Sequence, residues 1–335
     1  MSNVSAKTRK IKVCWIFTFI QLGRFRKKAV LRALQYRLTI KSMKQPSLFD
    51  TPEIHIDKPI RLIELFGGIG AQAMALRDIG ANFEHYRLIE FDKYPVASYN
   101  AIHKTHFTPQ DITKISGKDL GIVDVENYTY LLTYSFPCQD LSLAGNRKGM
   151  AKGSGTRSGL LWEVERLLNE VENLPQVLLM ENVPQVHGEK NRADFYNWIQ
   201  YLTKRGYSSF WQDLNSKDFG VAQSRKRCFM VSFLGDWEFD FPDGFKLDKT
   251  MKDYLEKDVD EKYYINTDKA REMIKNLVAQ NVFTEIDRYI ERETVSFSVA
   301  GAKRIDIANC ITAREDRGIS NRARTGSGVI ELQPN

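Results

Sequence analysis

The stretch IRLIELFGGIGAQAMALRDIG, Ile60 to Gly80, decides the fold. Its apolar start predicts a β-strand over residues 60–66, and residues 71–79 after the glycines predict a short helix. Glycines between a strand and a helix let the backbone approach a ligand closely, and the helix N-terminus favours polar or anionic groups. The stretch therefore predicts an α/β domain with a ligand site between its first strand and first helix.

The alternation of strand and helix continues along the chain. Apolar runs predict strands over 85–91, 131–134, 177–182 and 228–233, and helices over 94–103, 160–171 and 195–202. The run VLLMEN is apolar almost throughout, which is typical of a parallel sheet buried on both faces. This order predicts a doubly wound, Rossmann-like α/β sheet in a domain over residues 58–234, with a second, incomplete region over 235–335.

The charge of the chain is unevenly distributed. The formal net charge is +7, but residues 1–49 contain 12 Lys and Arg and no Asp or Glu, so the rest of the chain is net acidic. Any nucleic-acid case must therefore rest on local basic patches. We expect residues 1–57 to be a basic extension, disordered or non-native, with Met43 as the natural start. Its apolar run VCWIFTFIQLG is too short to span a bilayer, although a basic interfacial helix is an alternative. We expect a cytoplasmic protein without a membrane partner.

An acidic residue follows the second predicted strand at a spacing typical of nucleoside sites. Glu90 lies 20 residues after Gly70, where a carboxylate can hold a pair of ribose hydroxyls. FGGIG is shorter than the GxGxxG motif that seats a pyrophosphate. This favours S-adenosyl-L-methionine over a nicotinamide cofactor, and a methyltransferase over an oxidoreductase. A glycine turn beside a surface glutamate is the alternative.

Two reactive side chains stand at predicted strand ends. Cys138 in PCQ leaves the sheet on a loop, where strand ends place reactive groups, although a small buried hydrophobe is the alternative. Glu181 in MENV ends a buried strand, so we expect a raised pKa or a strong partner, with a helix-capping acid as the alternative. The four cysteines are far apart and show no metal-ligand spacing, so we predict neither a zinc site nor a disulfide framework.

Basic residues gather in two segments. QSRKRCFMV places Arg225 and Arg227 on one side of a strand, where they can grip a phosphate or a carbonyl oxygen, with a solvated basic edge as the alternative. The segment 144–159, AGNRKGMAKGSGTRSG, has five glycines and no acid, which favours a mobile lid that meets phosphates over an ordinary linker. Its four basic residues are Arg147, Lys148, Lys152 and Arg157.

Five motifs follow one another along the chain: FGGIG, an acid after the second strand, PCQ, ENV and QxRxR. In this order they closely resemble the motifs of the DNA (cytosine-5) methyltransferases. The resemblance covers roughly residues 60–233. The resemblance implies that Cys138 attacks carbon 6 of the target cytosine. It implies that Glu181 holds ring nitrogen 3 and the amino group, and that Arg227 holds the ring carbonyl oxygen. The implied cofactor is S-adenosyl-L-methionine.

The resemblance also implies the residues that hold this cofactor. Phe66, Gly67, Gly68 and Gly70 match its loop, Glu90 the acid on the ribose, Phe91 the residue packed on adenine, and Asp111 in PQDIT the acid on the adenine amino group. Duplex DNA is the expected partner, contacted by Arg225 and by the four basic residues of segment 144–159.

The chemistry needs such a set of residues. Carbon 5 of cytosine is a poor nucleophile until a thiolate adds across the 5,6 bond. The charge that develops on the ring needs an acid at nitrogen 3 and a cation near the carbonyl oxygen. The base must also be flipped out of the duplex, which costs a few kcal/mol. The mechanism needs no metal.

The sequence departs from the family in its last third. An RE-type motif and a late GNSV-like motif are missing, and the stretch from Ile305 to Leu332 resembles the opening of a recognition region. We therefore interpret residues 235–335 as an incomplete target-recognition region, and the chain as a truncated or split enzyme of a restriction–modification or phage system. A complementing C-terminal fragment or a cognate restriction endonuclease is then a partner. A DNA-binding remnant without activity and a transfer-RNA methyltransferase are the alternatives.

Overall fold

The computed structural model describes residues 11–12, 56–141, 149–245, 247–256, 259–260, 264–265, 268, 272, 292–298, 301–310 and 326–331. These residues form two compact units. The first unit contains the described residues of 56–214 together with 226–243, and the second contains 11–12, 215–225 and those from 244 onward. The expected domain functions stay predictions.

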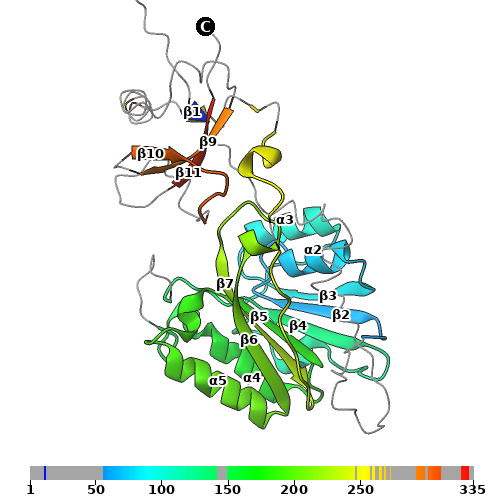
Figure 1. Cartoon of the computed structure of the whole chain (residues 1–335). Helices are drawn as coiled ribbons and strands as arrows, with labels where there is room; N and C mark the ends of the chain where they lie inside the picture. The colour runs from blue at the N-terminus through cyan, green and yellow to red at the C-terminus, as the bar shows by residue number, and fades with distance from the viewer. Residues whose placement is uncertain are drawn as a thin grey trace, which may run out of the picture. The chain divides into compact units, whose positions relative to one another are not determined.

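A six-stranded sheet forms the centre of the first unit, in the order β3-β2-β4-β5-β7-β6 (Figure 1). The strands are β2 (Ile60–Leu65), β3 (Phe83–Ile89), β4 (Thr129–Tyr134), β5 (Val177–Asn182), β6 (Tyr207–Asn215) and β7 (Lys226–Leu234). The first four strands of that order are parallel neighbours, whereas β7 runs antiparallel to β5. The predicted α/β sheet is confirmed, while β6 and the reversed β7 are additions to the prediction.

Helices cover both faces of this sheet (Figure 1). They are α2 (Ala71–Asp78) and α3 (Lys93–His103) on one face, and α4 (Leu161–Glu170) and α5 (Arg192–Lys204) on the other. Because strand side chains alternate between faces, Leu62 packs in one cluster with Ala73 of α2, and Ile63 in another with Val164 of α4. Short 3₁₀ helices lie in the connections: η2 (Gly117–Leu120), η3 (Arg157–Leu160) and η4 (Pro184–His187).

The second unit contains an antiparallel sheet in the order β10-β9-β11-β1-β8. Its strands are β1 (Ile11–Lys12), β8 (Tyr264–Ile265), β9 (Arg292–Ser298), β10 (Gly301–Arg304) and β11 (Gly326–Glu331), with η5 (Ser216–Phe219) and η6 (Met251–Tyr254) in the same unit. The expected disorder of residues 1–57 and the start at Met43 fall mostly outside the described residues. Within the described part of the chain, no helix is long and apolar enough to cross a membrane.

Candidate active site

The predicted site residues leave the central sheet at one edge. The glycine loop follows β2, Glu90 follows β3, and Cys138 follows β4, while Glu181 is the last residue but one of β5. Parallel strands present their carboxyl ends at the same edge, which is where ligands bind in open α/β sheets. Because β7 is antiparallel to β5, Arg227 near its start lies at this edge as well.

The glycine loop leaves no room for a side chain at two of its positions, Gly67 and Gly70. Gly68 and Gly70 have positive φ angles of 57° and 82°. A Cβ at Gly67 would clash with the Leu88 side chain and lie 2.9 Å from Glu64 Cβ, and one at Gly70 would lie 2.6 Å from the Tyr99 ring. At Gly68, by contrast, a Cβ would meet no atom of the described residues within 4 Å. The loop is therefore packed tightly underneath and open at Gly68.

Glu90 ties the glycine loop to the end of β3. Its carboxylate accepts hydrogen bonds from the backbone N–H groups of Gly68 at 3.1 Å and Asp92 at 3.0 Å. Glu90 follows β3 rather than ending it, because the strand stops at Ile89. The next residue, Phe91, is 74% exposed, so its ring is available to a ligand. A fixed carboxylate, an exposed aromatic ring and open backbone at Gly68 fit an adenosine-containing cofactor.

Asp111 lies in the connection between α3 and β4. The backbone N–H of Gln110 donates to the carbonyl oxygen of Glu90 at 2.8 Å, which places Asp111 next to the Glu90 segment. The Asp111 carboxylate accepts from the hydroxyl of Thr113 at 2.8 Å and from its N–H at 3.0 Å. These hydrogen bonds lower the pKa of Asp111 below its usual value.

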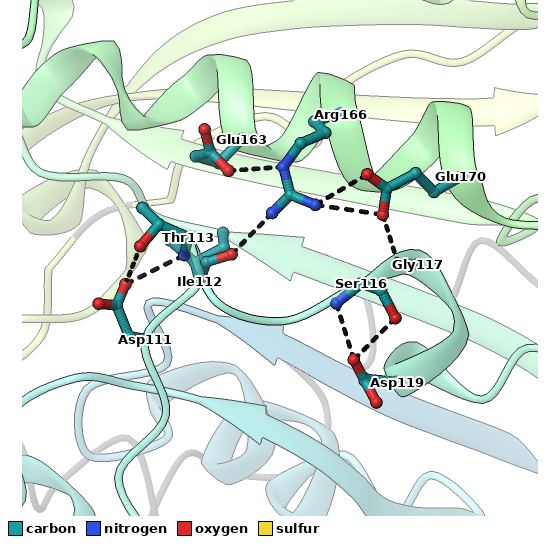
Figure 2. A network of polar contacts seen from close by, with 9 residues as sticks. All are labelled: Asp111, Ile112, Thr113, Ser116, Gly117, Asp119, Glu163, Arg166 and Glu170. Carbon is teal, nitrogen blue, oxygen red and sulfur yellow. Dashed lines mark hydrogen bonds and ion pairs between the residues drawn. The ribbon is translucent and has the colours of Figure 1, made fainter.

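Arg166 holds this loop against its own helix, α4 (Figure 2). Its guanidinium donates to the carbonyl oxygen of Ile112 at 2.9 Å, and it pairs with Glu163 at 2.8 Å and Glu170 at 2.9 Å. Glu170 also accepts from the N–H of Gly117 at 2.8 Å. Two points of the loop are therefore bound to one helix, and sequence analysis missed this function of Arg166 and Glu170.

Cys138 lies in a loop that is bound to the end of β5. Asn182 donates from Nδ2 to the carbonyl oxygen of Phe136 at 3.0 Å, and its Oδ1 accepts from the N–H of Val183 at 2.8 Å. Cys138 is half-buried and packs against the main core cluster. Asn182, the central residue of ENV and the residue after Glu181, thus joins the cysteine loop to the end of β5.

Asp140 anchors the far end of segment 144–159. Its buried carboxylate accepts from the N–H of Arg157 at 2.9 Å, and its carbonyl oxygen accepts from the N–H of Gly149 at 3.1 Å. Ser158 donates to the carbonyl oxygen of Pro137 at 2.7 Å. Residues 142–148 are outside the described part of the chain, so the mobile lid stays a prediction.

Glu181 and Arg227 form an ion pair, with 3.0 Å between Oε1 and Nε. Their side chains are 23% and 15% exposed, so the pair is partly shielded from solvent. A strong partner for Glu181 was one of the two expectations from sequence, and this ion pair confirms it.

The predicted DNA-binding residues occupy different environments. The Lys152 ammonium pairs with Glu165 at 2.7 Å, whereas Arg157 is exposed. Arg225 belongs to the second unit, where its guanidinium contacts the Cys310 sulfur at 3.6 Å. Arg147 and Lys148 lie outside the described residues.

A buried polar group beneath the glycine loop was not predicted. Glu64 in β2 has no exposed surface, and burial raises its pKa to about 7. Tyr99 donates to Glu64 at 2.5 Å and lies 2.7 Å from Nδ1 of His85. His103 Nε2 donates to the carbonyl oxygen of Ile69 in the loop at 3.0 Å. The acid inside the apolar run IRLIEL is the sequence signal that could have revealed this group.

The sheet order and the glycine loop at the ligand-binding edge define a Rossmann-like fold of the methyltransferase class. The family model of C-5 cytosine-specific DNA methylases matches residues 60–326. The orphan methyltransferase M.SssI of Spiroplasma monobiae is 35% identical over 263 residues, covering 62% of this chain and 68% of that protein. The type II methyltransferase M2.ScrFI of Lactococcus lactis is 33% identical over 261 residues, covering 63% and 71%.

A solved structure of an Entamoeba histolytica methyltransferase has the same fold, with a TM-score of 0.56 at 17% identity over 81% of this chain and 75% of that one. The chain belongs to the family of C-5 cytosine-specific DNA methylases. It is thus a DNA cytosine-5 methyltransferase with S-adenosyl-L-methionine as its cofactor, as expected from sequence. The functions of its individual residues stay predictions.

Proposed function

We propose that Cys138, Glu181 and Arg227 carry out methylation of carbon 5 of a flipped-out cytosine in duplex DNA. The observation that supports this most directly is the hydrogen bond from Asn182 to Phe136, which joins the cysteine loop to β5, the strand that carries Glu181, the ion-pair partner of Arg227. A nucleophile, an acid and a cation thus leave adjacent strands at one ligand-binding edge.

In this mechanism the chain activates the cytosine ring. The Cys138 thiol loses its proton to solvent and the thiolate adds to carbon 6, while Glu181 supplies a proton at ring nitrogen 3 and Arg227 faces the carbonyl oxygen. Carbon 5 then has the electron density to bond to an electrophilic methyl carbon, whose bond to the donor sulfur would break and leave its electron pair on that sulfur. Loss of the carbon 5 proton to a base and departure of the Cys138 sulfur from carbon 6 restore the 5,6 double bond. Nitrogen 3 returns its proton to Glu181.

The chain's cofactor site lies beside this machinery. Glu90 would hold the ribose hydroxyls, Phe91 would pack on the adenine ring, and Asp111 would accept from the adenine amino group. The open backbone at Gly68 leaves room for the nucleoside. When bound, S-adenosyl-L-methionine supplies an electrophilic methyl group on a sulfonium.

Covalent trapping tests this proposal. The full chain is incubated with labelled S-adenosyl-L-methionine and a duplex containing 5-fluorocytosine, whose carbon 5 has no proton to lose. We expect a denaturation-resistant protein–DNA adduct, and none with Cys138→Ser. Absence of an adduct with the wild-type chain, both alone and with an added C-terminal fragment of a relative, would favour a DNA-binding remnant.

The relatives named above suggest the biological setting. They are an orphan and a type II methyltransferase, both bacterial, and a phage SPR orphan methyltransferase is 33% identical over 251 residues. We propose a cytoplasmic enzyme of a bacterial or phage modification system, with a cognate endonuclease or a complementing fragment as partner. Competition between duplex DNA and transfer RNA for labelled methyl transfer tests the choice of substrate.

A further inference from the structure

Three potential metal ligands from separate elements meet next to the candidate active site. His187 ends η4, Asp213 lies in β6 and Cys228 lies in β7, and one donor atom from each lies within 4.8 Å of the other two. In the sheet, Cys228 is the register partner of Asn182, the residue after Glu181. Cys228 therefore follows Arg227 directly in β7, and its partner in β5 follows Glu181 directly.

We propose that His187, Asp213 and Cys228 bind one divalent transition ion of borderline softness, of the class of Zn²⁺ or Co²⁺. An imidazole nitrogen, a carboxylate oxygen and a thiolate sulfur are the donors that Zn²⁺ takes in proteins. Mg²⁺ and Ca²⁺ prefer sites made of oxygen ligands, so a thiolate ligand disfavours them. Three protein ligands leave a fourth, tetrahedral position for water.

The contacts within the cluster leave one carboxylate oxygen for the ion. Asp213 Oδ1 lies 2.9 Å from Nε2 of His187, and Oδ2 lies 3.2 Å from the Lys226 ammonium. An ion between Oδ1 and Nε2 would replace their direct hydrogen bond, while Lys226 continues to orient the carboxylate through Oδ2. The His187 ring also packs against Trp211, with 4.6 Å between ring centroids, which limits its rotation. Such outer contacts orient metal ligands and tune their affinity.

Binding of the ion changes no oxidation state, and its protons and charges balance. The Cys228 S–H bond breaks, its proton goes to solvent, and the sulfur bonds to the ion as a thiolate. His187 bonds through the lone pair of its neutral nitrogen, and Asp213 through its charged oxygen. The two negative ligands neutralise the two positive charges of the ion, which reduces the cost of burying it.

The Cys228 thiol lies where thiol chemistry with solvent is blocked. Cys228 is fully buried. A buried cysteine in such surroundings is inert toward oxidation and disulfide exchange. The side chains of His187 and Asp213 are 25% and 18% exposed, so an ion can enter from their side.

Ligand spacing along the sequence does not indicate this site, because the common metal-binding motifs place their ligands only a few residues apart. Here the three ligands are 26 and 15 residues apart, and only the packing of η4, β6 and β7 brings them together.

Titration of the full chain with Co²⁺ tests the site. We expect one equivalent to produce a thiolate-to-cobalt charge-transfer band in the near ultraviolet, and Zn²⁺ to abolish it by displacement. Cys228→Val, which keeps the buried volume, should remove the band. Asp213→Asn should weaken Co²⁺ binding by about tenfold or more, since even outer-shell changes cost tenfold to 100-fold. Cys138→Ser is the matched control and should keep the full band.

Two results would overturn the proposal. One is a wild-type chain that gives no charge-transfer band, in which case the cluster is an ion pair beside a buried thiol. The other is a band that persists in Cys228→Val, which would place the bound ion on another cysteine. Circular dichroism of each variant establishes that it is folded, and Asp213→Asn alone decides the question if Cys228→Val is not.

Discussion

Glu64 is an ionisable side chain without exposed surface, two residues before the glycine loop. Burial raises its pKa from 4.5 to about 7, so the folded state binds a proton that the unfolded state releases between these values. Its stabilising effect is complete below pH 4.5 and is lost as the pH rises through 7. A change of this size corresponds to about 3 kcal/mol.

We therefore expect Glu64→Gln to flatten the pH dependence of stability. Glutamine cannot ionise, but its amide oxygen can still accept the hydrogen bond from Tyr99. Urea unfolding of the wild-type chain between pH 5 and pH 8 should show a decrease in unfolding free energy that the variant lacks. Glu126→Gln, at an exposed position, is the control and should keep the wild-type slope. Equal slopes in all three proteins would contradict this account of Glu64.

Gly70 allows a second prediction at the residue scale. A side chain at Gly70 would be strained by the positive φ, and its Cβ would clash with the rings of Tyr99 and His103. Gly80 has a positive φ of 72°, but a Cβ there would meet no described atom within 4 Å. Gly80→Ala should thus cost only the backbone strain, roughly 1–2 kcal/mol.

Gly70→Ala should cost more than Gly80→Ala in unfolding free energy, and it alone should weaken cofactor binding measured by calorimetry. Similar losses in both variants would show that the packing beneath the loop is unimportant.

At the scale of elements, α4 positions the loop that carries Asp111. Arg166→Met keeps the aliphatic part of the side chain but removes its bonds to Ile112, Glu163 and Glu170. We expect the KM for S-adenosyl-L-methionine to rise about tenfold, since one hydrogen bond to a charged group contributes about 1.5 kcal/mol or more. The kcat should change little, because the loop contacts no reacting atom. Arg192→Met, at an exposed position of α5, should leave both constants unchanged.

The elements also show what sequence patterns can and cannot predict. Continuous apolar runs located β2 and β5 well because both faces of these strands are largely buried, and apolar periodicity located α4 because one face of this helix is buried. It missed β6, whose sequence YSSFWQDLN mixes polar and apolar residues on both faces. Apolar patterns also could not predict the direction of β7, since the same pattern fits a parallel and an antiparallel strand.

The site residues divide in the same way. The placing of Cys138, Glu181 and the glycines at one edge was predictable because they lie near or just after strand ends, and the carboxyl ends of parallel strands meet at one edge. Asn182, Asp140 and Arg166 were missed because they act on backbone atoms of distant loops. On a sequence, Glu163, Arg166 and Glu170 look like the solvated face of a helix.

At the scale of the whole molecule, the net positive charge belongs to the first fifty residues, so DNA affinity of the first unit must come from local basic residues. The structure separates two candidates on segment 144–159. Arg157 is exposed at its far end, where Asp140 fixes the backbone, whereas the Lys152 ammonium is already paired with Glu165 and lies 5.4 Å from the Trp162 ring centroid. Of these two residues, Arg157 is the one that can neutralise a phosphate without first breaking an ion pair.

We therefore expect Arg157→Gln to reduce the slope of log affinity against log salt concentration by about 0.9, the value for one phosphate contact on duplex DNA. Lys152→Gln, the matched change five residues earlier, should reduce it much less, because its charge is compensated by Glu165. Fluorescence anisotropy of a labelled duplex with the full chain, over a series of salt concentrations, measures both slopes. A larger decrease for Lys152→Gln would mean that the Glu165 pair opens on DNA and that Lys152 is the phosphate contact.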